Sequence, residues 1–130
     1  MPSSSRFVNA MAASVSGVTI VSTAVGGRQV GADRLADHQV GLAEAFAGRG
    51  ERPHESLARD WWPCAGGLPR LHGAAARFEC RVERTLEAGT HTLVLGAVTR
   101  AVRGTATPLA YTRRGYVAPL ASERLDLRAA

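Results

Sequence analysis

The sequence predicts a small, mainly β domain with helices attached to it. Residues 77–83 (RFECRVE) alternate strictly, so that Phe78, Cys80 and Val82 share one strand face and charged residues occupy the other. Residues 92–99 are apolar and rich in β-branched side chains, and Gly89 lets the chain reverse between the two segments. Together they form a long antiparallel hairpin, which buries little by itself. The rest of the chain must therefore complete a sandwich or barrel around it.

Length and composition fit one domain over residues 1–130, with a modest core built from a chain that is 45% hydrophobic. All 16 basic residues are arginines, and the lack of lysine excludes Schiff-base catalysis and a P-loop. The net charge is +5, but the arginines are scattered among acidic residues and only 5% of residues are aromatic. We therefore expect no nucleic-acid surface, whereas an anionic small molecule is compatible with this charge.

Cysteine and histidine positions give no sign of a metal site or a secreted, disulfide-bonded domain. Cys64 and Cys80 lie far apart in the sequence, which favours free thiols. His38, His54 and His72 lack the spacing of metal ligands. No segment reaches the length of a transmembrane helix and no signal-peptide pattern opens the chain, so we expect a cytoplasmic protein without a membrane partner.

The first half of the chain predicts two helices and a short hairpin. Apolar side chains recur at helical spacing over residues 7–15, and we expect this helix to pack across one end of the barrel. Residues 18–23 and 28–30 are β-branched or extended around a Gly-Gly turn, which indicates a hairpin. A second helix is expected over residues 37–47, before a terminating glycine.

The second half predicts a loop and a closing strand on either side of the long hairpin. Residues 49–67 are charged and then contain Trp61 and Trp62, which is typical of a surface loop with a tryptophan anchor. Residues 108–112 (PLAYT) predict a last strand. Residues 113–116 predict the turn that closes the fold.

Seven segments between Phe7 and Tyr116 carry a resemblance to a known family. They read FVNAMAASVSGVTIVST, GRQVG, LADHQVGLAEAFAG, DWW, GLPRLHGAAARFECRVE, AGTHTLVLGAV and PLAYTRRGY. In this order they resemble the short-chain flavin reductases, small FMN-dependent split-barrel dimers that deliver reduced flavin to a partner monooxygenase. The resemblance implies a split β-barrel, mainly β with helices, that forms a homodimer.

One part of the family pattern is missing from this chain. In the family, the block that resembles residues 28–31 continues into a strand and loop rich in threonine and serine, a buried strand and a short helix. Here the next family block, which begins at Leu35, follows almost at once. The resemblance implies that the missing segment holds most of the groups that cradle the flavin ring and phosphate of FMN. We therefore expect a truncated split barrel without a flavin shelf.

Three residues are candidates for catalysis. The resemblance places His91 beside flavin and nicotinamide, and Tyr111 and Arg113 in the closing turn near the same pocket. Histidine exchanges protons near neutral pH, which suits a general acid or base, although a histidine that merely begins a strand explains His91 equally well. A phenol and a guanidinium can polarise one group of a substrate.

Four further residues are candidates for contact with a substrate. Trp61 and Trp62 can stack on a flat ligand at the pocket mouth, although one of them is expected to plug the barrel. Arg114 can join Arg113 in clamping a carboxylate, enolate or phosphate, and Tyr116 can donate a hydrogen bond to an oxyanion. Solvated turn arginines and a packed tyrosine are the simpler explanations.

Three functions are compatible with these observations. Loss of the flavin shelf favours a barrel that uses no cofactor and catalyses a non-redox step on a small molecule, such as a proton transfer, cyclisation or cycloaddition in bacterial specialised metabolism. The alternative is an NAD(P)H:flavin oxidoreductase that uses FMN, rebuilds its site with a dimer partner and supplies a monooxygenase. The third is a non-catalytic subunit or scaffold that pairs through an exposed sheet edge.

Overall fold

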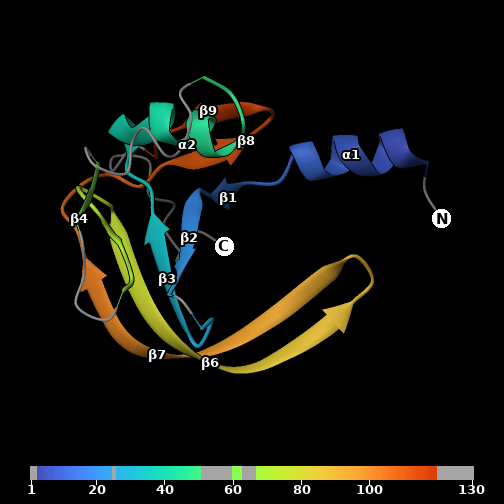
Figure 1. Ribbon diagram of the computed structural model, residues 1–130. Helices are drawn as coiled ribbons and strands as arrows, with labels where there is room; N and C mark the ends of the chain where they lie inside the picture. The colour runs from blue at the N-terminus through green and yellow to red at the C-terminus, as the bar shows by residue number, and fades with distance from the viewer. Residues whose placement is uncertain (1–2, 25, 51–59, 63–66, 120–130) are drawn as a thin grey trace, which may run out of the picture.

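The computed structural model describes residues 3–24, 26–50, 60–62 and 67–119. Its centre is a four-stranded antiparallel sheet in the order β2-β3-β6-β7 (Figure 1). These strands are β2 (Thr19–Thr23), β3 (Gln29–Arg34), β6 (Ala76–Ala88) and β7 (His91–Arg103). The long hairpin expected from the alternating pattern is thus β6 and β7, and the mainly β fold class is confirmed.

Smaller elements surround one end of this sheet. A three-stranded sheet has the order β1-β8-β9, and β4 pairs with β5. The strands are β1 (Ser16–Gly17), β4 (Trp61–Trp62), β5 (Arg70–Leu71), β8 (Ala110–Thr112) and β9 (Gly115–Val117). The helical elements are α1 (Ser4–Ala12), the 3-10 turn η1 (Asp37–Gln39) and α2 (Val40–Phe46). The helix expected over residues 37–47 is therefore split into a 3-10 turn and an α-helix.

The apolar core lies between the upper part of the sheet, α2 and β4-β5. Trp61 is 6% exposed and its ring centroid lies 6.2 Å from that of Phe46. The other buried members of this cluster come from several elements and are Ile20, Leu35, Leu42, Ala43, Leu71 and Leu109. The core therefore occupies one end of the sheet and leaves the far part of the hairpin outside it (Figure 1).

Near the core the four-stranded sheet turns a charged face inward, while Phe78, Cys80 and Val82 on the other face are half-buried, as the alternating pattern predicts. Cross-strand pairing places Asp33 opposite Arg77, and both residues are buried. On the opposite face, Val21 and Val98 are 65% and 59% exposed. Strict alternation shows that two faces differ, but it does not show which face the other elements cover. Here β4-β5 covers the charged face.

A buried ion pair explains why the charged face is tolerated inside. The Arg77 Nη1 atom lies 2.6 Å from Asp33 Oδ2, and Arg77 Nε lies 3.1 Å from Glu79 Oε1. Burial raises the pKa of the Asp33 carboxyl, although Arg77 acts in the opposite direction. Partial burial would raise the pKa of Glu79 too, but the hydrogen bond and charge of Arg77 outweigh it and lower that pKa. Arg77 is therefore a cation shared by two carboxylates.

Gly31 makes room for this ion pair. A Cβ atom at Gly31 would lie 2.7 Å from Ser22 Oγ and 3.0 Å from Arg77 Nη2. Since side-chain carbons do not approach polar atoms so closely, any larger residue would displace the guanidinium. Gly31, the last residue of the GRQVG segment, therefore leaves the space that the Arg77 side chain occupies.

Helix α1 packs on nothing along most of its length, so the expectation that it covers a barrel end is wrong for a single chain. No residue of α1 is buried, and Phe7 is 58% exposed. Its contacts lie near its C-terminal end, where Ala12 O accepts from Arg113 N and Asn9 Oδ1 lies 3.3 Å from Arg114 Nη2. Figure 1 shows α1 projecting sideways from the body.

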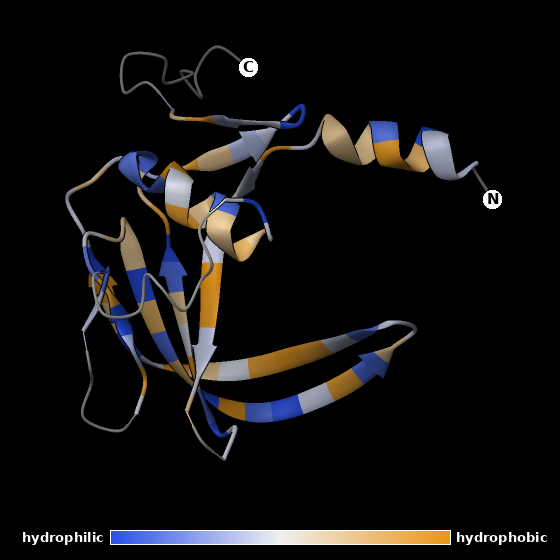
Figure 2. Cartoon of the chain, turned by 45° about the horizontal axis from the view of Figure 1, so that its top comes forward, coloured by the Kyte–Doolittle hydropathy of each residue, from blue (hydrophilic) through white to orange (hydrophobic). Residues whose placement is uncertain are grey.

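The outer part of the β6-β7 hairpin is also apolar and uncovered. Leu93, Val94 and Leu95 are all exposed, and Figure 2 shows the hydrophobic bands that run along this arm. Two β-bulges, between Glu79 and Cys80 and between Val82 and Arg84, shift the register of β6 against β7. The arm therefore extends well beyond the sheet without a covering layer from its own chain.

Two general findings complete the description. Within the described residues, no helix is long and apolar enough to cross a membrane. Cys80 carries a free thiol, while Cys64 lies outside the described residues.

The buried ion pair predicts a characteristic pattern of unfolding free energies. Arg77→Met leaves the Asp33 carboxylate without its cation and is expected to cost about 3–5 kcal/mol at neutral pH. The double variant Asp33→Leu/Arg77→Met removes both charges and is expected to be neutral or more stable than wild type. Urea unfolding of the three proteins measures both values.

The pH dependence of the single variant provides the control. Without Arg77 the folded-state pKa of Asp33 rises further above its unfolded value, so the variant is stabilised at low pH and loses stability as pH rises through that pKa. An Arg77→Met protein equally destabilised at all pH values would contradict the assignment of the loss to Asp33.

Candidate functional site

The predicted site residues fall into three separate places in one chain. His91 begins β7 at the tip of the long hairpin, and Tyr111 and Tyr116 lie in β8 and β9. Trp61 and Trp62 form β4 on the other side of α2. Figure 1 shows the hairpin tip and the β8-β9 sheet well apart, so a single chain does not bring His91 to the closing turn.

His91 is exposed and has a local polar contact. It pairs with Ala88 across the hairpin, and its Nδ1 lies 3.0 Å from Thr90 Oγ1. Thr90 can hold one tautomer of the imidazole, which leaves Nε2 for another partner. His91 is thus accessible, at the hairpin tip, to groups outside its own chain.

The two tyrosines line a groove, here named the tyrosine groove, with a volume of about 320 Å³. Their ring centroids are 5.2 Å apart and the rings meet edge to face at 65°. The groove is lined by Ser16, Gly17, Val18, Thr19, Ala43, Ala47, Arg49, Tyr111 and Tyr116. It therefore combines aromatic walls with hydroxyl groups and one guanidinium.

Polar atoms in the tyrosine groove are ready to bind a ligand. Thr19 Oγ1 is buried without a hydrogen-bond partner. Burial and a hydrogen bond to Glu44 raise the pKa of Tyr116, so its phenol stays protonated. Arg49 Nη1 lies 3.7 Å from Glu44 Oε1 and is largely exposed. A buried hydroxyl with no acceptor or donor is costly, and a bound polar ligand would remove that cost.

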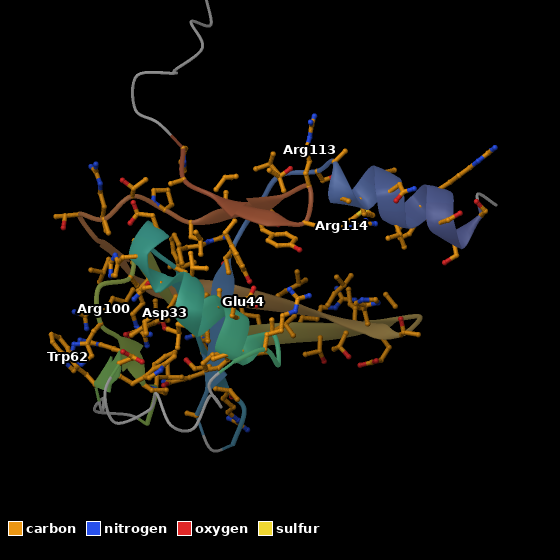
Figure 3. All side chains as sticks on the ribbon, turned by 90° about the horizontal axis from the view of Figure 1, so that it is seen from above. Asp33, Glu44, Trp62, Arg100, Arg113 and Arg114 are labelled. Carbon is orange, nitrogen blue, oxygen red and sulfur yellow. The ribbon has the colours of Figure 1, made fainter. Side chains whose placement is uncertain are left out.

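Arg113 and Arg114 do not line the tyrosine groove. Both adopt left-handed backbone conformations, with φ of 48° and 61°, which are strained for residues other than glycine. Figure 3 shows them beside α1, on the far side of the molecule from Trp62 and Arg100. In one chain they hold the closing turn and the end of α1 together.

A second cavity, here named the arginine cleft, was not anticipated from the sequence. It has a volume of about 420 Å³ and lies beside β5, β6 and β7. Its lining includes Trp62 and three arginines, Arg70, Arg77 and Arg100. The period-two pattern assigns Arg77 to the solvent face, so periodicity gave no signal for this cleft. The one signal in the sequence was Asp33, an acidic residue that directly follows Val30, Gly31 and Ala32 in β3.

No metal centre is indicated. Among the residues that the structure describes, no group of three histidine, cysteine, aspartate or glutamate side chains is placed to hold a metal ion.

Comparison with known proteins identifies the family. Residues 30–119 match the model of the flavin reductase like domain. The chain belongs to this family. Solved structures of the same fold include the flavin reductase PheA2, with a TM-score of 0.78 and 22% identity over 92% of this chain and 99% of that one. The NADH:FAD oxidoreductase SgcE6 of Streptomyces globisporus gives a TM-score of 0.74 and 20% identity over 90% and 94%.

Curated relatives are more similar in sequence but longer. The stachydrine N-demethylase reductase subunit Stc3 of Rhizobium meliloti is 34% identical over 98 residues, which cover 74% of this chain and 41% of Stc3. The NADH-dependent FMN reductase RutF of Variovorax paradoxus is 39% identical over 82 residues, 62% of this chain and 45% of RutF. The chain thus spans less than half the length of these relatives.

These findings correct two expectations drawn from the sequence. A non-redox function in specialised metabolism and the absence of a cofactor were inferred from the missing family segment. The relatives are instead named as flavin reductases, several of them as FMN reductases that use NADH. The names of these relatives therefore favour the flavin reductase alternative over a non-redox function.

The environments of the two tryptophans predict distinct spectroscopic behaviour. Trp62 is 57% exposed, so Trp62→Phe is expected to abolish most fluorescence quenching by acrylamide and to leave the melting temperature nearly unchanged. Trp61→Ala empties part of the core and is expected to cost about 3–5 kcal/mol. Unaltered quenching in Trp62→Phe would show that Trp62 is covered in solution.

Proposed function

We propose that this protein is an NAD(P)H-dependent flavin reductase that supplies reduced flavin to a partner monooxygenase. The match of residues 30–119 to the flavin reductase like domain is the observation that carries this proposal. The oxidoreductase names of its relatives support it, and Stc3 is itself named as the reductase subunit of a demethylase. Such an enzyme would transfer a hydride from the nicotinamide to a bound flavin, and the flavin would take up one proton from solvent.

The tyrosine groove fits a flavin. Its volume of about 320 Å³ is within the usual range for a small-molecule site. Tyr111 and Tyr116 supply aromatic surface for a flat ring, and Thr19 Oγ1 is a buried polar atom without a partner. Arg49 supplies positive charge for a phosphate. The family site implied by resemblance, at Tyr111 and Tyr116, falls in the same groove.

Each residue of the groove has a distinct role in this proposal. When bound, the flavin supplies two-electron redox chemistry. The Tyr116 phenol donates its proton to the Glu44 carboxylate, so its oxygen remains available to accept a hydrogen bond from a ligand N–H group. The Thr19 hydroxyl positions the ring and Arg49 neutralises the phosphate. His91 exchanges a proton with the surroundings of the reacting ring.

A homodimer completes this site. His91 lies at the tip of the hairpin, away from the tyrosine groove of its own chain (Figure 1). The hairpin arm carries exposed Leu93 and Leu95, and α1 carries exposed Phe7 and Met11. Exposed apolar surface on two projecting elements favours association, and a second copy is the partner that would also bring a histidine to the groove.

The direct test is steady-state oxidation of NADH and NADPH by the purified full chain, with and without added FMN or FAD. Oxidation that requires flavin, together with saturable flavin binding, is expected. A protein that binds no flavin and oxidises neither nicotinamide would overturn the proposal.

Removal of the Thr19 hydroxyl is expected to weaken flavin binding without lowering the stability of the protein. Thr19→Val keeps the side-chain shape and removes the buried hydroxyl, so flavin affinity is expected to fall about tenfold. The melting temperature is expected to hold or rise, because the hydroxyl has no partner in the free protein. The matched control is Thr23→Val on the same strand, whose exposed hydroxyl bonds Ala24 O. Fluorescence titration and thermal unfolding measure both effects.

A mixing experiment tests the two-chain site. His91→Ala and Arg49→Glu alter exposed residues, so each variant is expected to fold and to be inactive as a homodimer. A mixed dimer keeps one intact combination of groove and histidine. An equimolar mixture, unfolded and refolded together, should therefore regain about one quarter of wild-type turnover. Absence of recovery would place the complete site within one chain.

A further inference from the structure

We propose that the arginine cleft is a second binding site, separate from the tyrosine groove, for a nucleoside diphosphate. The phosphates would lie among Arg70, Arg77 and Arg100, and the base would stack on Trp62. The inference does not depend on flavin reductase activity.

The charges in the cleft are not balanced by the protein. Three arginines line it, while the nearby acidic partners are Asp33 and Glu79. Glu79 Oε1 is shared, at 3.1 Å from Arg77 Nε and 3.4 Å from Arg70 Nη2. Within the described part of the chain, Arg100 forms no ion pair of its own, although it lies close enough to help lower the pKa of Glu79. One positive charge is therefore left for an anion.

Unsatisfied donors point to the same conclusion. Arg77 is 6% exposed, and its Nη2 atom has no hydrogen-bond acceptor. The Nε atom of Arg70 is likewise buried without a partner. Buried guanidinium donors without acceptors are costly, and phosphate oxygens suit their planar geometry. Arg77 Nη2 lies close to Gly31 and Ser22, so the Nε atom of Arg70, a lining residue of the cleft, is the donor that a phosphate oxygen would satisfy first.

The walls of the cleft suit an attached ring. Trp62 is exposed, and its ring meets His72 edge to face at 4.3 Å. Since 57% of Trp62 remains exposed beside this contact, it keeps surface for stacking, and base stacking on an aromatic side chain tolerates any base. Figure 3 shows Trp62 and Arg100 on the same side of the molecule as Asp33. Phosphate and base contacts are thus available together.

Small residues keep the cleft open. Gly73, Ala74, Gly104 and Ala106 are among its lining residues. A Cβ atom at Gly104 would collide with the carbonyl oxygen of Ala74, so that position requires glycine. The cavity of about 420 Å³ falls in the range of small-molecule sites. Backbone there can approach a ligand without hindrance from side chains.

The test is titration of the full chain with ADP, inorganic pyrophosphate, adenosine and NADH, followed by tryptophan fluorescence and calorimetry. ADP is expected to bind more tightly than adenosine, and added salt should weaken it because the contact is ionic. Arg100→Ala is expected to weaken ADP binding about 10-fold to 100-fold, the effect of a charge-assisted hydrogen bond. Arg28→Ala removes an exposed arginine outside the cleft and should leave ADP affinity unchanged.

Titration with NADH distinguishes two sources of the diphosphate, a dinucleotide and a free nucleotide. Competition between NADH and ADP, weakened equally by Arg100→Ala, would identify the dinucleotide as the source. Binding of ADP alone would identify a free nucleotide. If wild type binds neither, or Arg100→Ala and Arg28→Ala bind ADP as well as wild type, the inference is wrong. Flavin-dependent NADH oxidation is measured in parallel, and it tests the proposed flavin reductase function independently of ADP binding.

Discussion

The contact between Arg77 and Asp33 determines the arrangement of much of the remaining structure. It joins β3 to β6 through two charges that would be costly to bury alone. The ion pair lies on the face of the sheet that β4-β5 covers, and its burial there is tolerated because the two charges are paired and hydrogen-bonded. It also sets the need for glycine at position 31 and leaves the valines of the opposite face in water.

The same contact links fold and ligand binding. Arg77 donates from Nη1 to Asp33 and from Nε to Glu79, and its Nη2 atom is left buried without an acceptor. Its neighbours Arg70 and Arg100 belong to the same cavity. The positive character of the arginine cleft therefore follows from how the sheet is closed, and does not depend on residues added to the surface for binding.

Local sequence patterns predicted the positions of the helices and strands well, but they predicted less well which faces of these elements are covered. Alternation located β6, and helical spacing located α1 and α2, because both periods are properties of the chain itself. The covered face of the sheet depended on Asp33 meeting a residue 44 positions away, which no local period contains. Resemblance to the family suggested His91 and Tyr116 as candidates, but their separation within one chain depends on the three-dimensional fold, which no local pattern contains.

The two bulges in the long hairpin have a consequence for how the sequence can vary. Each inserts an unpaired residue, so strand positions on either side of a bulge no longer share a face according to odd or even number. Glu83 is the residue of β6 that is left unpaired between Val82 and Arg84, and its deletion would keep the pairs Val82–Gly96 and Arg84–Leu95 while it removes the bulge. The local bend and twist of the hairpin would then decrease, which would change the direction in which the outer arm carries Leu93 and Leu95. Changes in length here would alter the surface offered by the arm more than most substitutions would.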